Sequence, residues 1–159
     1  MKKLIIFYSF EGSTKLIAET IAQEIGADIL ELKPKKELPT KGFMKYIWGG
    51  RQLFMKKQPD LLPIDKNLND YDLIFIGTPV WAWTFNPVLK SFLSSNKILN
   101  KKIALFCCHG GGKGKVFEKM KIALLNNEFI GQQDFCEPIK RNTEKNIKLA
   151  KIWAKGLAG

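Results

Sequence analysis

The sequence predicts an α/β fold, in which a parallel β-sheet is covered by helices on both of its faces. Apolar runs rich in strand-forming residues alternate with segments of helical periodicity along the chain. Strands that are separated by helices are joined by crossovers, and such crossovers pair the strands in parallel. The length of 159 residues predicts one domain over residues 1–159, because domains commonly contain about 100–200 residues.

Five segments are expected to form the strands. Lys3–Tyr8, Asp72–Gly77 and Lys102–Cys108 are continuous apolar runs, the pattern of strands that are buried on both faces. Asp28–Lys33 alternates between apolar and polar residues, and Phe129–Glu137 is a weaker, more polar run. These two segments are therefore expected at the edges of the sheet.

Four segments show the periodicity of helices. The first, Ser13–Ile25, is followed by Gly26 as a stop signal. The second begins at Asn86-Pro87, where Asn is a good cap and Pro suits the first helical position, and it continues through Leu93. The other two are Val116–Leu125 and Thr143–Leu157, the latter with its buried side expected at Ile147, Ala150, Ile152, Trp153 and Leu157.

Composition and charge narrow the class of protein. The chain carries 26 basic and 15 acidic residues, a net charge of +11, which bears on partners and solubility rather than on fold. No apolar run reaches the ~18 residues of a membrane helix, and Glu11 interrupts the apolar start that imitates a signal peptide. Cys107, Cys108 and Cys136 lack the spacing of metal ligands. We therefore expect a cytoplasmic protein without a metal site, in which the adjacent cysteines pack at a strand end.

Ligands of doubly wound sheets bind beyond the carboxyl ends of the strands, where the strand order reverses. The first loop at such an end joins a buried strand to a helix and contains Ser9, Phe10, Glu11, Gly12, Ser13 and Thr14. Unpaired N–H groups and the positive end of the helix dipole make this kind of junction an anion site. No Walker-type lysine follows, which favours a phosphate monoester over a nucleoside triphosphate. An ordinary helix cap is the alternative.

The second loop is rich in aromatic residues and contains Thr78, Pro79, Val80, Trp81, Ala82 and Trp83. Aromatic side chains at the ligand edge of a sheet would expose apolar surface to water unless they pack against the core or a ligand. Stacking against a planar heterocycle adds ~0.5–1.5 kcal/mol beyond the burial of area. We expect at least one of Trp81 and Trp83 to cap the core and the other to contact a ligand.

The third loop is rich in glycine and contains His109, Gly110, Gly111 and Gly112 after Cys108. Glycines leave the backbone open to a flat ligand, with N–H groups free to bond ring oxygens and nitrogens. His109 is the only histidine of the chain, and a lone histidine is more often structural than functional. A flexible surface turn is the alternative, but it does not explain why all three loops fall at one edge.

With these loops the sequence resembles the flavodoxin-like family over nearly the whole chain. Ser9, Gly12 and Thr14 match the family's first-loop motif, which wraps the phosphate of FMN. The resemblance implies a five-stranded parallel sheet of order 2-1-3-4-5, FMN as the cofactor, and no catalytic residue. It also implies that the segments 9–14, 78–83 and 108–112 bind FMN, the last two beside the isoalloxazine ring.

Two redox roles remain open. The chain is either an electron carrier that serves a partner protein, or a reductase that passes electrons from NAD(P)H to a quinone or similar acceptor. Electron-carrier flavodoxins often have a glycine in the second loop, but none lies between Trp81 and Phe85. Glu11 places a carboxylate near the expected phosphate, so that it must point away or its neighbours must compensate. The small size mildly favours the carrier, and the missing glycine and the long connection Pro34–Tyr71 mildly favour the reductase.

Functions without a flavin find less support. Receiver domains need clustered aspartates at the ends of the first and third strands, where this chain has Tyr8, Ser9, Gly77 and Thr78. A cysteine phosphatase built on Cys108 needs an arginine at the position of Gly114.

The connection 34–71 is too long for a bare loop, and Gly42–Lys57 is expected to form a broken amphipathic helix. The stretch 33–57 is basic, with Glu37 as its one acidic residue and with interleaved aromatic residues. Such a composition also suits nucleic acid or an anionic membrane surface. Over both we favour a flap whose aromatic residues pack on the domain or on a second copy in a homodimer.

Overall fold

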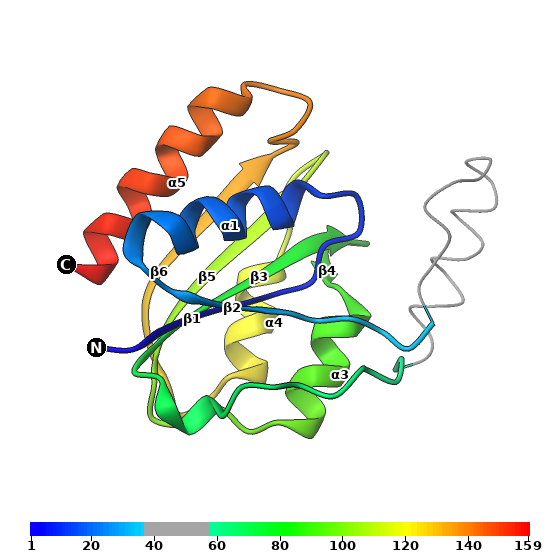
Figure 1. Cartoon of the computed structure of the whole chain (residues 1–159). Coiled ribbons are helices and arrows are strands. Elements are labelled where there is room, and N and C mark those ends of the chain that lie inside the picture. The colour runs from blue at the N-terminus through cyan, green and yellow to red at the C-terminus, as the bar shows by residue number, and fades with distance from the viewer. Residues whose placement is uncertain (37–57) are drawn as a thin grey trace.

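Strands and helices alternate along the chain in the computed structural model, which describes residues 1–36 and 58–159 (Figure 1). The elements are β1 (Lys3–Phe7), α1 (Ser13–Ile25), β2 (Asp28–Glu31), a short 3-10 helix (Leu68–Asp70), β3 (Leu73–Trp81), β4 (Thr84–Phe85), α3 (Pro87–Ser95), β5 (Lys102–His109), α4 (Val116–Ala123), β6 (Glu128–Cys136) and α5 (Thr143–Ala158).

The central sheet has the order β2-β1-β3-β5-β6, and each of these neighbours pairs in parallel. The predicted parallel α/β fold is therefore confirmed. The predicted strand count of five is wrong, because β4 forms a sixth strand that pairs antiparallel with the end of β3. Counting β4, the order 2-1-3-4-5 becomes 2-1-3-5-6.

The third strand is longer than its apolar run. The apolar run predicts an end at Gly77, but β3 continues to Trp81 and pairs with β5 through Thr78 and Pro79. The Thr-Pro pair resembles a turn signal, and pairing with the buried strand β5 overrides that local preference. The chain then reverses at Ala82-Trp83 into β4.

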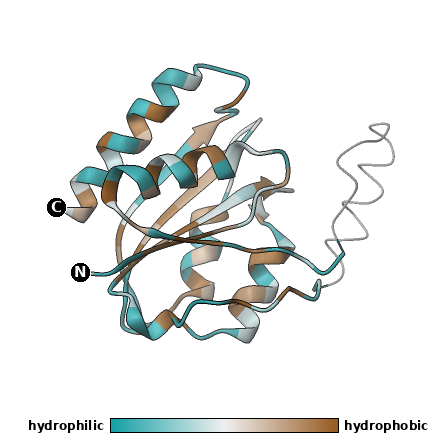
Figure 2. Cartoon of the chain, viewed as in Figure 1, coloured by the Kyte–Doolittle hydropathy of each residue, from teal (hydrophilic) through white to brown (hydrophobic). Residues whose placement is uncertain are grey.

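Helices cover both faces of the sheet, with α1 and α5 on one face and α3 and α4 on the other (Figure 1). Because successive strand residues point to opposite faces, Ile5 and Phe7 of β1 pack with α1 and α5, whereas Leu4 and Ile6 belong to the other core. Figure 2 shows hydrophobic residues along the strands and mixed colouring on the helices, as expected for helices that bury one side.

The helix boundaries follow local signals. Gly26 ends α1 in the left-handed conformation (φ 62°), and its N–H donates to Ala22. At the start of α3, Asn86 Oδ1 accepts from Val88 N at 2.7 Å. One prediction for α5 is wrong: Ile152 is 62% exposed, whereas Ala150 and Ala154 are fully buried. Two residues from Ala150, Ile152 lies on the other side of the helix.

Residues 33–35, at the start of the long connection, pair with residues 60–62. Lys35 N donates to Asp60 O and Leu62 N to Lys33 O, both at 2.8 Å. The amphipathic helix predicted for Gly42–Lys57 lies outside the described residues. Among the helices of 1–36 and 58–159, none is long and apolar enough to cross a membrane.

Candidate functional site

A pocket of about 260 Å³ lies at the carboxyl ends of β1, β3 and β5. All three predicted loops contribute to it, as expected for the edge of a doubly wound sheet. The loop after β6 contributes as well. The lining residues are Ser9, Phe10, Glu11, Ser13, Thr14, Pro79, Val80, Trp81, Cys108, His109, Gly110, Glu137 and Lys140.

The first loop is shaped around the hydroxyl oxygen of Ser9. This oxygen accepts hydrogen bonds from Gly12 N at 3.2 Å and from Lys15 N at 3.1 Å. Gly12, with φ 101°, turns the chain into α1 in a conformation that favours glycine. Within the described residues, the N–H groups of Ser13 and Thr14 at the start of α1 have no acceptor. Gly12 does not line the pocket, and it contributes by turning the chain into α1.

Thr14 connects the first loop to the third. It is almost fully buried, and its side chain lies beside the Cys108 thiol. Burial raises the pKa of Cys108 to about 12, although the contact with Thr14 lowers it. Cys107 belongs to the opposite core, and burial raises its pKa as well. Both thiols are therefore neutral packing groups rather than a redox pair.

The second loop is a tight hairpin rather than an open loop. Ala82 and Trp83 form its turn with φ values of 48° and 59°, a conformation that usually selects Asn or Gly. Thr78, predicted to touch a ligand, is fully buried: its hydroxyl accepts from Asn86 N at 3.0 Å and donates to Pro79 O at 2.9 Å. Thr78 thus holds the base of the hairpin, outside the pocket.

The two tryptophans of the hairpin have separate environments. Trp81 is 5% exposed and meets Phe10 edge-on, with ring centroids 5.4 Å apart. Trp81 belongs to the hydrophobic core and also lines the pocket. Trp83 is 68% exposed and lies against Gly114, outside the pocket lining. The expectation that one tryptophan caps the core holds for Trp81. Ala82 also lies outside the pocket.

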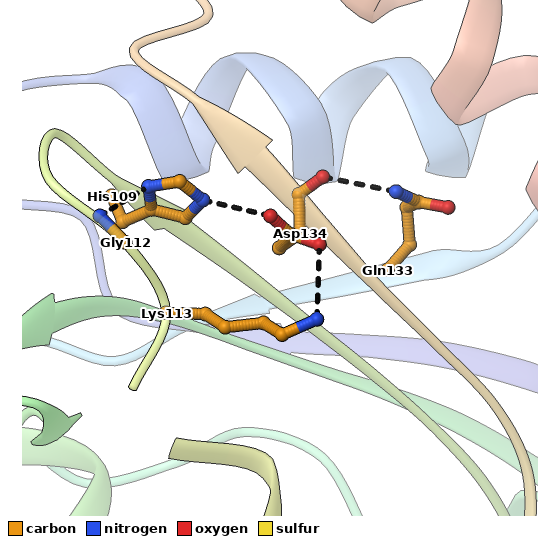
Figure 3. Close-up of polar contacts among 5 residues, drawn as sticks. All are labelled: His109, Gly112, Lys113, Gln133 and Asp134. Carbon is orange, nitrogen blue, oxygen red and sulfur yellow. Dashed lines mark hydrogen bonds and ion pairs between the residues drawn. The ribbon is translucent and has the colours of Figure 1, made fainter. Parts of the chain in front are cut away.

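The third loop is organised by His109 (Figure 3). The backbone N–H of Gly112 donates to His109 Nδ1 at 3.0 Å. Nδ1 therefore carries no proton, and the proton on Nε2 is donated to Asp134 Oδ2 at 2.7 Å. Lys113 Nζ lies 3.7 Å from the other oxygen of Asp134.

These contacts set the charge state of Asp134. Partial burial raises its pKa, but the hydrogen bond from His109 and the charge of Lys113 outweigh burial and lower the pKa below its usual value. Cys108, His109 and Gly110 line the pocket, whereas Gly111 and Gly112 form the outer part of the loop. Gly112 has φ 121°, which suits glycine alone.

Glu137 and Lys140 are pocket residues that the sequence analysis missed. They follow β6, whose polar sequence indicates an edge strand. The sequence analysis looked for ligands where the strand order changes, and an edge strand lies away from that point. The rule that ligands bind beyond the carboxyl ends of the strands could have identified this segment too, because β6 ends at the same edge of the sheet as β1, β3 and β5. Glu137 N donates to His109 O at 2.9 Å and so brings this segment against the third loop.

The fold and the pocket define the class of this protein: it is a doubly wound α/β protein with a ligand-sized pocket at the carboxyl edge of its sheet. The family model for flavodoxin matches residues 2–132. The chain therefore belongs to the flavodoxin family.

Solved structures agree with this assignment. A candidate flavoprotein from Bacteroides eggerthii has a TM-score of 0.78 at 20% identity, covering 99% of this chain and 98% of its own. A flavoprotein from Lactobacillus acidophilus, solved in complex with FMN, has a TM-score of 0.69 at 26% identity, covering 89% and 98%. General stress protein 14 from Treponema denticola, also solved with FMN, has a TM-score of 0.63 at 16% identity and covers 99% of each chain. No curated protein matches the sequence.

Proposed function

We propose that this chain binds FMN in the pocket at the carboxyl ends of β1, β3 and β5 and transfers electrons to a protein or small-molecule acceptor. The observation that carries the proposal is the convergence of three loops of different character on one pocket. Membership of the flavodoxin family supports it. The Lactobacillus acidophilus flavoprotein, which is 26% identical and was solved with FMN, supports the choice of cofactor.

The start of α1 suits the phosphate of FMN. The N–H groups of Ser13 and Thr14 have no acceptor within the described part of the chain, and they lie at the positive end of the helix dipole. The hydroxyl of Ser9 accepts two hydrogen bonds and keeps its own proton for donation. Ser9, Ser13 and Thr14 would therefore hold the phosphate.

The remaining walls suit a flat, partly polar ring. Pro79, Val80 and Trp81 supply apolar and aromatic surface from the end of β3, and His109 and Gly110 supply the facing end of β5. Because glycine has no side chain, Gly110 contributes backbone atoms alone to the pocket wall. These residues would border the isoalloxazine ring.

FMN, when bound, supplies the redox chemistry, and the protein contributes binding, orientation and electrostatics. His109 has no proton to give to the pocket, since Nε2 donates to Asp134 and Nδ1 accepts from Gly112. It therefore shapes the site rather than exchanging protons with it. The net charge of +11 favours acidic partner proteins or anionic nucleotides as redox partners.

The test is to mix the purified protein with FMN, remove free flavin by desalting, and record the absorbance spectrum. We expect flavin bands at about one FMN per chain; a protein without flavin bands would contradict the proposal. Titration of the bound form with dithionite and then with NADPH separates the two roles. Stepwise one-electron reduction and no reaction with nicotinamides identify a carrier, whereas direct two-electron bleaching by a nicotinamide identifies a reductase.

A further inference from the structure

The His109 ring connects the glycine-rich third loop to strand β6 (Figure 3). We propose that His109 is a positioning residue, whose ring holds this loop in its FMN-binding shape only while Nδ1 is unprotonated, so that acidification weakens FMN binding. The inference rests on the proposed function, because it assigns a regulation by protons to the same cofactor pocket.

The outer part of the third loop is sparsely packed. Apart from chain neighbours, a Cβ atom on Gly111 or on Gly112 would meet nothing within 4 Å. Glycine also leaves the backbone more conformational freedom than any other residue. The hydrogen bond from Gly112 N to His109 Nδ1, at 3.0 Å, closes this segment onto the ring. We therefore expect the loop to loosen when this loop-closing bond is lost.

The inner part of the same loop belongs to the pocket. His109 and Gly110 line it, and Gly110 lies two residues from the loop-closing bond. The backbone of His109 is held separately, because its carbonyl oxygen accepts from Glu137 N at 2.9 Å. A change at the ring therefore alters the glycines that follow His109 while the end of β5 stays in place.

The two ring nitrogens respond differently to a second proton. In the neutral ring Nε2 donates to Asp134 Oδ2 at 2.7 Å, and Nδ1 accepts from Gly112. A proton on Nδ1 turns both nitrogens into donors. The contact with Asp134 then becomes an ion pair, whereas Nδ1–H faces the N–H of Gly112, and two donors form no hydrogen bond. The second proton thus keeps the contact with β6 and breaks the loop-closing bond.

The charges around the ring permit this protonation. Histidine is the side chain that commonly changes its charge between pH 5 and pH 8. Although partial burial raises the pKa of Asp134, the contacts with His109 and Lys113 outweigh burial and lower it, so the carboxylate stays ionised over this range. The charge of Lys113, 3.7 Å from Asp134, opposes a proton on His109, but Asp134 is in direct contact with the ring.

The other charged groups near the ring belong to the pocket lining and to the segment that follows β6. There are two of each sign, and they are Glu11, Glu137, Lys140 and Arg141. Glu137 and Arg141 pair with each other at 2.7 Å. Because these four charges balance, the charge that His109 meets is set mainly by Asp134 and Lys113.

The experiment measures dissociation constants of FMN at pH 8 and at pH 5, by quenching of flavin fluorescence. The wild type is compared with His109→Asn and His109→Gln, neither of which titrates at this position. The oxygen of Asn replaces Nδ1 and accepts from Gly112 at both pH values, whereas Gln lacks an acceptor there. The phosphate of FMN itself gains a proton near a pKa of about 6. It does so for all three proteins, so His109→Asn gives the reference pH effect.

We expect acidification to weaken FMN binding about fivefold more in the wild type than in His109→Asn, because one hydrogen bond is lost. His109→Gln should bind FMN about fivefold more weakly than His109→Asn at both pH values, with the same pH effect. Equal pH effects in the wild type and in His109→Asn would overturn the inference. Equal FMN affinities of the two variants would overturn it as well.

A second measurement uses the flavin-free wild type and needs no variant. The ¹⁵N chemical shifts of the His109 ring report the proton on Nδ1, and the amide shift of Gly112 reports the loop-closing bond. We expect both to change together between pH 8 and pH 5. A protonated Nδ1 with an unchanged Gly112 amide, or a ring that stays neutral at pH 5, would overturn the inference. If the wild type binds no FMN at pH 8, the proposed function fails, whereas this measurement still decides whether protons control the loop.

Discussion

His109 Nε2 lies 2.7 Å from Asp134 Oδ2, and this hydrogen bond joins the third loop to the edge strand β6. The other ring nitrogen of His109 accepts from Gly112 N at 3.0 Å. The carboxylate thus selects the ring tautomer, and the tautomer provides the acceptor that closes the glycine-rich loop. His109 therefore lines the pocket and also supports the glycine-rich third loop through its hydrogen bonds (Figure 3).

Substitutions of His109 should separate its two hydrogen bonds. In His109→Asn the side-chain oxygen takes the place of Nδ1 and can accept from Gly112, whereas in His109→Gln the terminal amide takes the place of Nε2 and can donate to Asp134. We expect amide hydrogen exchange at Gly112 to accelerate about tenfold in His109→Gln, since a hydrogen bond contributes ~1 kcal/mol or slightly more. His109→Asn should stay near the wild type. The reverse order would show that the bond to Asp134 alone holds the loop.

Tyr71 should make the stability of the protein sensitive to alkaline pH. Its hydroxyl donates to Asp28 Oδ2 at 2.7 Å, and this bond together with burial raises its pKa to about 12. A raised pKa means that the stabilisation is complete below the unfolded value of about 10 and is lost as the pH rises from there towards the folded value. Denaturant unfolding at pH 8 and pH 11 should show this loss in the wild type, and Tyr71→Phe should show a smaller one. An equal loss in both proteins would assign the effect to other groups.

Gly77 and Gly111 form a matched pair for a packing test. A Cβ atom on Gly77 would overlap the ring of Phe106, which is fully buried in the neighbouring strand β5. Gly77→Ala should therefore destabilise the fold by about 1–3 kcal/mol or more through overpacking. A Cβ atom on Gly111 would meet nothing within 4 Å, so Gly111→Ala should stay within about 0.5 kcal/mol of the wild type. Similar unfolding free energies for the two variants would contradict this packing.

The cysteines should differ in reactivity. Cys107 and Cys108 are buried and their thiols are neutral, whereas Cys136 is exposed at the end of β6. A thiol-reactive dye should label one cysteine rapidly in the native protein and all three after unfolding. Cys136→Ser should abolish the rapid phase. Rapid labelling that persists in this variant would mean that the end of β5 opens to solvent.

The alternating pattern of strands and helices could be predicted because each element carries its own periodicity and end signals. The start and end of α1 agree with the prediction for Ser13–Ile25. The extension of β3 and the strand β4 could not be predicted, because Thr78-Pro79 is a local turn signal and the turn at Ala82-Trp83 contains no glycine. Pairing with distant residues of β5 decides this region, and such pairing leaves little trace in the local sequence.

The sequence could predict which loops form the candidate site, but not which residues of those loops line the pocket. The rule for doubly wound sheets places the loops at one edge, yet it does not distinguish Thr78, which supports the hairpin, from Trp81, which lines the pocket. Lys140 was missed because a polar edge strand precedes it. Its neighbours Ile139 and Glu137 lie against Gly12 and Gly110, and no local sequence pattern encodes contacts between such separate loops.

FMN binding at the carboxyl ends of β1, β3 and β5 can be tested residue by residue. The most direct measurement is a titration of the ¹⁵N-labelled protein with FMN, followed by the chemical shifts of the backbone amides. We expect large shifts for Ser13, Thr14 and Gly110 and none for Asn100 and Asn126 at the opposite edge of the sheet. Shifts confined to the opposite edge, or no shifts at saturating FMN, would contradict it.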